Sequence, residues 1–390
     1  MKKLLLLGLV GCSLFANELD SYLSQSYKEL FDTEVKKSLK QGDFNFLSWV
    51  SPLVLSYERS WNNQIEGSWS PKSVYSIGID QPIFKSGGIF YGIIYANSNK
   101  NLATLSAKKE RSKLSSSAVG LLFQIKQIKL SIAKLKLQVK NAKIEAKRAQ
   151  ELFGAGLVDS VVLDNAFVKI DEAQIALLNL ESNLLTLKSE YKKIGNSSLK
   201  NAKLPKLRLL SKDEFLSRNA DLKVAKAKAR SSKYYAKVIR SKYLPTISVG
   251  ARYSKMSKAP TPRSKDAFTN YSLKVSMPLS VNVGNELEIA KLDSIISAIK
   301  VKNSSIAQDA TYDAIVKRVR LIDKKIALAR KEARGYGRIL KSTKNLYRAG
   351  QKSIDDVRLL TNSLNIKRLD SKIYKIDKSL EILKLYERVE

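Results

Sequence analysis

Residues 149–156 read AQELFGAG, and residues 343–350, which lie 194 positions further along the chain, read TKNLYRAG. Each segment ends in a glycine, the residue that most readily takes a positive φ angle and so ends a helix. A new stretch with helical apolar periodicity follows both glycines. The two segments therefore predict the turns of two helical hairpins, one at Gly154 and Gly156 and the other at Gly350.

The helices that lead into these turns repeat with the same offset. In the first copy the apolar positions alternate in steps of four and three residues, the pattern of a heptad repeat. In the second copy nine of the ten equivalent positions are again apolar or aromatic, so the register is shared. The first set is Leu121, Ile125, Ile128, Ile132, Leu135, Val139, Ala142, Ala146, Ala149 and Phe153. The second is Ile315, Val319, Ile322, Ile326, Ala329, Ala333, Tyr336, Leu340, Thr343 and Tyr347.

Two strand candidates precede each long helix, because apolar and polar residues alternate there with a period of two. We expect strands at about 49–61 and 73–84, and at about 243–256 and 269–281. Prolines mark their limits: Pro52 and Pro245 open the first strand of each pair, and Pro82 and Pro278 close the second.

The chain is thus predicted to contain two repeats, each with a strand hairpin and a long helical hairpin. The first repeat covers 17–195, with an N-terminal helix at about 18–41 and a helical hairpin at about 95–194. The second covers 213–390, with an ascending helix before its strands and a helical hairpin at about 285–390. A linker at 196–212 joins them.

Composition excludes several kinds of site. Histidine is absent and Cys12 is the only cysteine, which removes Cys/His metal sites, a cysteine nucleophile and histidine-based triads. We therefore expect no enzyme, no catalytic residue and no cofactor. The formal charge is +34, but the lysines are scattered along helical stretches, where a charge usually lies on a solvated face.

The first 16 residues have the features of an export signal. Lys2 and Lys3 precede an apolar core at 4–10, and Ala16 is a small residue suited to cleavage. A second interpretation is a lipobox at 9–12, which would make Cys12 the lipid-modified first residue. Both interpretations take the mature protein out of the cytoplasm and argue against nucleic acid as a partner.

No other stretch approaches the ~18 consecutive apolar residues of a membrane helix. Four strands cannot close a membrane barrel alone, since the smallest have about eight. Either the sheet is packed in a soluble protein, or several chains pool their strands. Aromatic residues near the strand ends favour pooling, because they suit membrane interfaces. They are Trp49, Trp61, Trp69, Tyr75, Phe84, Tyr243, Tyr253, Phe268 and Tyr271.

The first long helix carries a second apolar line at Phe123, Leu130, Leu137 and Ile144, opposite the heptad pattern. A helix that is apolar on two sides suits a cylinder in which every helix has two neighbours. The second copy departs from this pattern. It has basic residues at the equivalent positions, with Leu321 and Leu328 as alternative apolar contacts; these basic residues are Lys317, Lys324, Lys331 and Arg338.

Several motifs together resemble the TolC family of outer-membrane factors. One is the strand at 75–84 with Gln81-Pro82 and then Gly87-Gly88; the others are Tyr243-Leu244-Pro245 and the two helical turns. The resemblance implies an α+β membrane fold, in which a homotrimer forms a 12-stranded β-barrel in outer-membrane lipid and a helical barrel in the periplasm of a Gram-negative bacterium. It also places 196–212 in an equatorial region.

The resemblance further implies a function and partners. The chain would be the exit duct of a tripartite efflux or type I secretion system, working with an inner-membrane pump and a periplasmic adaptor protein. The alternatives are an exported coiled-coil adaptor or scaffold protein without a membrane barrel, and a basic nucleic-acid or phospholipid binder. The cargo and the class of pump stay open.

The resemblance also implies a gate near the hairpin turns. Lys352 takes the place of a basic gate residue, Asp356 that of a first pore acid with Asp355 beside it, and Leu359 that of a second acid. In the first hairpin Val161 and Val162 replace a polar pair, and Asp159 and Asp164 lie close enough to compensate. The alternative for Asp355 and Asp356 is an acidic pair that stabilises a helix N-terminus.

Overall fold

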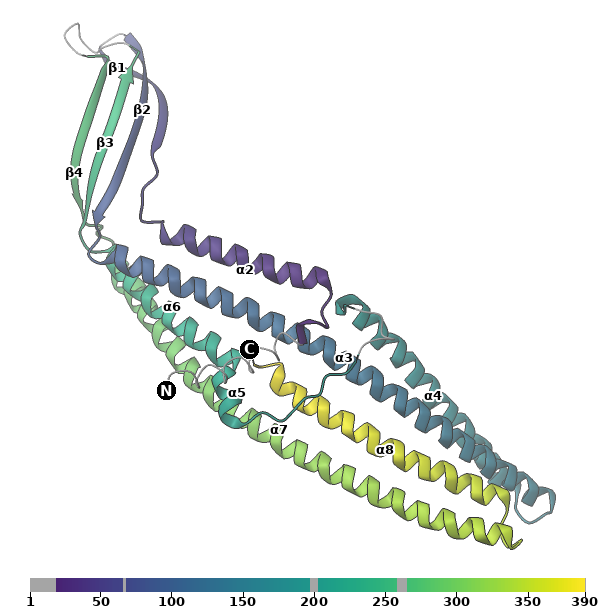
Figure 1. Cartoon of the computed structure of the whole chain (residues 1–390). Coiled ribbons are helices and arrows are strands. Elements are labelled where there is room, and N and C mark those ends of the chain that lie inside the picture. The colour runs from purple at the N-terminus through teal and green to yellow at the C-terminus, as the bar shows by residue number, and fades with distance from the viewer. Residues whose placement is uncertain (1–18, 66–67, 197–202, 258–264, 390) are drawn as a thin grey trace, which may run out of the picture. The chain divides into compact units, whose positions relative to one another are not determined.

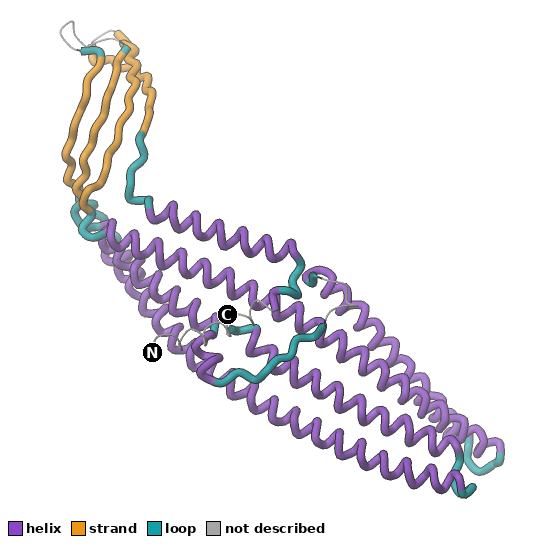
Figure 2. The backbone as a smooth tube through the Cα atoms, viewed as in Figure 1, coloured by secondary structure: helices purple, strands orange, loops and turns teal. Residues whose placement is uncertain are grey.

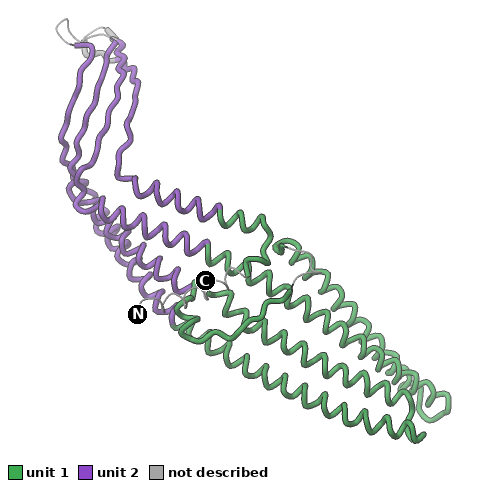
Figure 3. Tube along the Cα trace, viewed as in Figure 1, with its two compact units in different colours: residues 1–32, 108–220, 306–390 green, residues 33–107, 221–305 purple. Residues whose placement is uncertain are grey.

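The computed structural model describes residues 19–65, 68–196, 203–257 and 265–389. The predicted signal segment, including Cys12, lies outside them. The chain divides into two compact units (Figure 3): Met1–Asp32, Lys108–Ala220 and Ile306–Glu390 form unit 1, and Thr33–Ala107 and Asp221–Ser305 form unit 2. The elements labelled in Figure 1 are α2 (Gln25–Phe46), β1 (Val54–Ile65), β2 (Ser68–Phe84), α3 (Gly88–Gly154), α4 (Ser160–Ile194), α5 (Lys212–Arg218), α6 (Ala220–Lys242), β3 (Thr246–Met256), β4 (Ala267–Ser276), α7 (Val283–Arg348) and α8 (Ile354–Tyr386).

Unit 1 consists of long helices that lie side by side (Figures 1 and 2). Ion pairs between neighbours give their order. Lys136 of α3 lies 3.8 Å from Glu181 of α4, Lys134 of α3 lies 2.7 Å from Asp370 of α8, and Lys378 of α8 lies 2.8 Å from Asp323 of α7. The helices therefore form a row in the order α4–α3–α8–α7, with α4 and α7 as its outer members.

The residues of the predicted heptad pattern hold this row together. Ile125, Ile132, Ala146 and Ala149 are buried along α3, and their equivalents along α7 are buried too: Val319, Ile326, Leu340 and Thr343. Burying each large aliphatic side chain contributes about 1.5–3 kcal/mol, so packing, rather than helix propensity alone, stabilises helices of this length.

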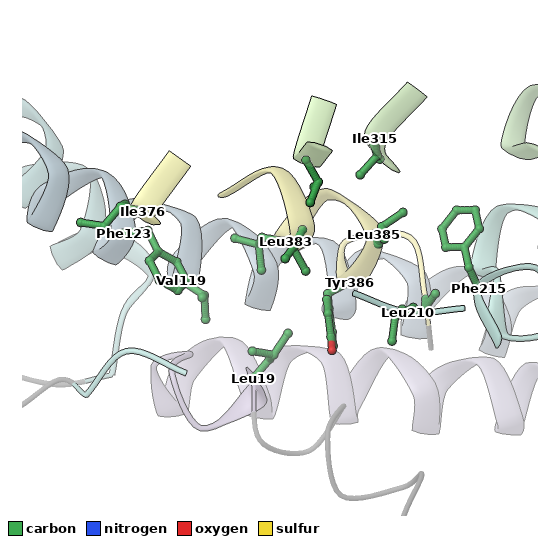
Figure 4. Packing of buried hydrophobic residues seen from close by; sticks show 13 residues of the cluster. Leu19, Val119, Phe123, Leu210, Phe215, Ile315, Ile376, Leu383, Leu385 and Tyr386 are labelled. Carbon is green, nitrogen blue, oxygen red and sulfur yellow. The ribbon is translucent and has the colours of Figure 1, made fainter. Parts of the chain in front are cut away.

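The main core of unit 1 gathers segments that are far apart in the sequence (Figure 4). Val119 and Phe123 of α3 pack there with Leu383 and Leu385 from the end of α8. Phe215 of α5 joins them, and so does Leu210 from the irregular segment before α5. The C-terminal residues are thus part of the core.

Unit 2 contains one antiparallel sheet in the order β1–β2–β3–β4 (Figure 2). β1 begins at Val54, later than the predicted 49, because the Gln81 side chain forms hydrogen bonds with backbone groups of the residues before Val54. Its amide accepts a hydrogen bond from Ser51 N (2.9 Å) and donates one to Trp49 O (3.1 Å). The residues before β1 are therefore held by a side chain instead of by a neighbouring strand.

Other boundaries also differ from the sequence expectation. β4 ends at Ser276, not 281, since Pro278 cannot donate to a ladder. α3 begins at Gly88, not 95, directly after Ser86 and Gly87, which both take positive φ. The ascending helix of the second repeat is broken into α5 and α6 at Asn219, a fully buried residue whose side chain donates to Gln308 (3.1 Å).

Candidate functional site

The sheet has one apolar face and one polar face. Pairing places Leu55 beside Ile77 and Tyr253, and Val249 beside Leu273, on the same face. The opposite face carries mainly serine and charged side chains. The apolar face includes Leu55, Tyr57, Trp61, Tyr75, Ile77, Ile79, Val249, Ala251, Tyr253, Tyr271, Leu273 and Val275, and it also carries Arg59, Ser73, Lys255 and Thr269; the polar face includes Ser56, Glu58, Lys72, Ser76, Asp80, Ser248, Arg252, Ser254, Asn270, Ser272 and Lys274.

The apolar face is open to solvent in the single chain. Tyr271 is 78% exposed, Leu273 72% and Leu55 80%. The rings of Tyr57 and Tyr75 contact each other across β1 and β2, with centroids 4.8 Å apart and planes tilted by 38°, and both side chains remain exposed. Such a continuous exposed apolar patch marks a surface that another apolar phase or protein covers.

The two outer strands of the sheet, β1 and β4, each have one neighbour. Their free edges present backbone N–H and C=O groups, which are a template for pairing with another chain. In lipid these groups would each cost several kcal/mol if they stayed unpaired. The sheet therefore needs further strands at both edges wherever its apolar face meets lipid.

Both helical hairpins turn through the same backbone motif. Gly156 has φ 70° and Gly350 has φ 73°. Gly156 N donates to Phe153 O and Leu157 N to Leu152 O, both at 2.9 Å, and the equivalent bonds join Gly350 to Tyr347 (3.0 Å) and Gln351 to Leu346 (2.8 Å). This pair of bonds is a Schellman motif, so the 194-residue repeat extends to individual hydrogen bonds. Gly154, by contrast, is the last residue of α3.

The helix that follows each turn is capped at its N-terminus. Asp159 accepts from Val162 N (3.0 Å), and its equivalent Ser353 accepts from Asp356 N (3.1 Å). Asp356 returns the bond by accepting from Ser353 N, which completes a capping box. Asp159 and Asp356 thus each have a local structural role.

Asp356 also reaches the other hairpin, since Arg148 of α3 donates to it at 2.9 Å. The Ser353 N–H group, and then Arg148, hold the pKa of Asp356 below its usual value. Asp355 pairs with Arg358 at 3.0 Å. Lys352, Asp164, Val161 and Val162 are exposed.

The Arg148–Asp356 pair is the last of a series that the sequence analysis missed. Four polar side chains of α3, each seven residues after the one before, meet four of α8 that are also seven apart. We call this the polar ladder: Gln127 with Asp377, Lys134 with Asp370 (2.7 Å), Asn141 with Ser363 (3.5 Å) and Arg148 with Asp356 (2.9 Å). The seven-residue spacing of these polar side chains on both helices was visible in the sequence and could have indicated that α3 packs against α8.

The described residues include no helix long and apolar enough to cross a membrane. They also include no group of three or more His, Cys, Asp or Glu side chains arranged to hold a metal ion.

The sequence matches no protein-family model and no curated protein. Solved structures do match over almost the whole chain. VceC, an outer-membrane protein of Vibrio cholerae, is 13% identical with a TM-score of 0.74, covering 96% of this chain and 97% of its own. The Campylobacter jejuni CmeC outer-membrane channel is 17% identical with a TM-score of 0.75, and the match covers 96% of this chain and 85% of that channel's own chain. The open state of the Neisseria gonorrhoeae MtrE outer-membrane channel is 14% identical with a TM-score of 0.58, and the match covers 94% of this chain and 90% of that channel's own chain.

The chain has the fold of these outer-membrane channels. The resemblance to the TolC family that the motifs indicated is confirmed at the level of the fold, and so is the α+β class with its two copies of a strand hairpin and a helical hairpin. The channel fold includes the sheet as well as the long helices, which disfavours the alternative of a coiled-coil adaptor without a membrane barrel.

Proposed function

We propose that this chain is a subunit of an outer-membrane exit duct. The observation that carries the proposal is the four-stranded sheet with an exposed apolar face, a polar face and two free edges. In a closed barrel the apolar face would meet lipid and the polar face would line a water-filled lumen. The likeness in fold to the CmeC and MtrE channels supports this function.

Several copies are needed to close the barrel. Three copies of four strands would give 12, an ordinary number for an outer-membrane barrel. Each β1 edge would then pair with a β4 edge of another copy, which leaves no backbone group unpaired in lipid. We therefore propose a homotrimer in the outer membrane of a Gram-negative bacterium, after removal of residues 1–16 or lipid modification at Cys12.

The helices would continue the duct into the periplasm. α3 has 67 residues and α7 has 66, so each measures about 100 Å at 1.5 Å per residue. Helices of that length would bring the hairpin turns close to an inner-membrane pump. We propose a tripartite efflux or type I secretion system, with a periplasmic adaptor protein around the turns and no catalytic role for this chain.

The gate of the duct is proposed at the hairpin turns. Lys352, Asp355, Asp356, Asp159 and Asp164 all lie within ten residues of Gly156 or Gly350. The Arg148–Asp356 pair supports the proposal, because it joins the two hairpins of one chain beside a turn. The capping roles of Asp159 and Asp356 are the competing explanation for their presence.

A pair of lysine substitutions on opposite faces of β4 tests the channel function. Leu273→Lys puts a charge on the apolar face, which costs roughly 2–4 kcal/mol at the middle of a bilayer. We expect it to abolish assembled channels, measured as outer-membrane protein by membrane fractionation and as conductance in planar bilayers. Ser272→Lys, on the polar face of the same strand, should assemble and conduct.

Equal assembly of the two variants would show that the apolar face does not meet lipid. A wild-type protein that stays monomeric and fully folded without membrane or detergent would contradict the proposal as a whole.

A further inference from the structure

We infer that a cavity between α3, α8 and α7 binds a long aliphatic diamine, a ligand with an ammonium group at each end and an apolar chain between them. The inference goes beyond the proposed channel function and does not depend on it. Two separated carboxylates, the apolar walls between them and a buried hydroxyl that has no partner carry it.

The cavity has a volume of about 590 Å³ and lies where the three helices meet. This volume is usual for a small-molecule site, which is mostly apolar and has a few polar groups that fix the ligand. The apolar walls come from Leu121 of α3, Ile322 of α7, and Leu380 and Leu383 of α8. The cavity thus has the size and the lining of a site for an organic ligand.

Two carboxylates mark the ends of the cavity. Asp377 of α8 and Glu387, the residue that caps α8, are the first and the last residues of this helix end that line it. Ten helical residues separate them, a rise of about 15 Å, so one small cation cannot contact both. Among the described residues neither carboxylate forms an ion pair: Asp377 accepts from the Gln127 amide and is only partly compensated by Lys325.

The acidic residue between these two is already neutralised. Glu381 accepts hydrogen bonds from Arg318 (3.1 Å) and Lys384 (2.6 Å). These two cations repel a positive charge at the middle of the cavity, where Leu380 and Leu383 form the wall. A fitting ligand therefore carries its charges at its two ends and is neutral and apolar between them.

A buried hydroxyl lies toward the Glu387 end. Gln127 of α3 bonds to Asp377, and Ser112 bonds to a carbonyl at the end of α8 (3.4 Å), so the two helices are antiparallel and Ser116 lies near the level of Glu387. Ser116 lines the cavity and is 2% exposed, and its Oγ has no hydrogen-bond partner in the part of the chain that the structure describes. Buried polar groups nearly always have a partner. An ammonium group, with its three donors, would supply one to both Ser116 and Glu387.

The cavity is open on a side of α3 that the N-terminal segment does not cover. Leu122 of α3 packs with Leu23. Ser117 and Gln124 line the cavity and are exposed, and at 3.6 residues per turn they fall on the opposite side of the helix from Leu122. A ligand can therefore enter without displacing the N-terminal segment.

Binding of four probes to the purified, detergent-solubilised full-length protein tests the inference by isothermal titration calorimetry. Diaminododecane has two ammonium groups on a chain about as long as the cavity. Dodecylamine has one ammonium group, diaminopentane has two on a chain too short to reach both carboxylates, and dodecanediol has no charge. We expect diaminododecane to bind at least about tenfold more tightly than each of the other three, since only it forms a charged hydrogen bond at both ends.

Asp377→Asn and Glu387→Gln should each weaken the binding of diaminododecane about tenfold and bring it close to that of dodecylamine. Ser116→Ala should weaken it by a smaller factor. The matched control is Glu145→Gln, which removes the same charge at an exposed position of α3 outside the cavity and should bind like the wild type. Circular dichroism should show equal helix content in all variants.

Three results would overturn the site: equal binding of diaminododecane and dodecylamine, equal binding of dodecanediol, or a loss in Glu145→Gln as large as in the two cavity variants. The first two would leave an apolar cavity, filled by water or detergent, without recognition of two charges. None of these results would touch the proposed channel, because assembly and conductance are measured separately.

Discussion

At the scale of single residues, Asp377 of α8 is a partly buried carboxylate. It lies where α3, α7 and α8 meet and accepts a hydrogen bond from Gln127. Burial raises its pKa, and Lys325 offsets this only in part. A raised folded-state pKa means that the folded protein favours the protonated form. The stabilising contribution is therefore present at low pH and is lost as pH rises through the folded pKa.

Asp377→Asn should consequently raise the melting temperature of the detergent-solubilised protein at pH 7, since the amide keeps the acceptor for Gln127 without the charge. The gain should be small, about a few tenths of a kcal/mol, because the group is only partly buried. It should shrink as pH falls toward 4. Asp293→Asn, at an exposed position of α7, is the control that should show no such trend. A gain in melting temperature that does not change with pH would contradict the raised pKa of Asp377.

At the scale of elements, the hairpin turns offer a direct test of backbone conformation. Gly350 has φ 73° with open space around it, so an added Cβ would meet no neighbour and only backbone strain would matter. Gly350→Ala should therefore cost about 1 kcal/mol of unfolding free energy. Gly154→Ala, at a helical position with equally open space, should be neutral or slightly stabilising.

Hydrogen exchange of the two turns would check this prediction, with faster exchange at Gln351 expected in Gly350→Ala and unchanged exchange at Leu157 in Gly154→Ala. Equal effects of the two alanines would mean that the positive φ does not constrain the turn.

The same turns show why much of the fold could be predicted from the sequence. Glycine at a helix end, and apolar residues in steps of three and four, are local signals, and they appear twice at one offset. The start of β1 could not be predicted in this way, because it depends on the Gln81 side chain from 30 residues further along the chain. The break at Asn219 likewise depends on Gln308, a long-range partner that no local pattern reveals.

The candidate gate shows the same limit. Asp356 was predicted from the resemblance to the TolC family, and its capping box follows from the local sequence. Its pairing with Arg148 depends on how α8 packs against α3, which is a matter of tertiary structure. The seven-residue spacing of Gln127, Lys134, Asn141 and Arg148 was available as a clue to that packing, but only together with the spacing on α8.

At the scale of the whole molecule, the proposed trimer would place three copies of Asp356 around one duct. Like charges brought together in a narrow pore repel one another, and a multivalent cation relieves the repulsion. Divalent or trivalent cations added from the periplasmic side should therefore block conductance. Hydrogen bonds from Arg148 and Ser353 already compensate part of the negative charge on each Asp356 carboxylate. Leu359 also stands where a second acid is expected, so the block should be modest.

Single-channel recordings of Asp356→Ala and Asp355→Ala separate the gate from simple helix capping. If Asp356 lines the pore, its alanine variant should weaken cation block, whereas Asp355→Ala should change it less. Because the loss of Asp356 also removes the capping box, Asp356→Asn provides the necessary comparison: it retains a side-chain oxygen for Ser353 but has no charge. Asn and Ala should then reduce the block alike, because the charge is what attracts the cation. Undiminished block in both variants would limit Asp356 to capping α8 and would move the gate away from this residue, while the proposed channel would remain.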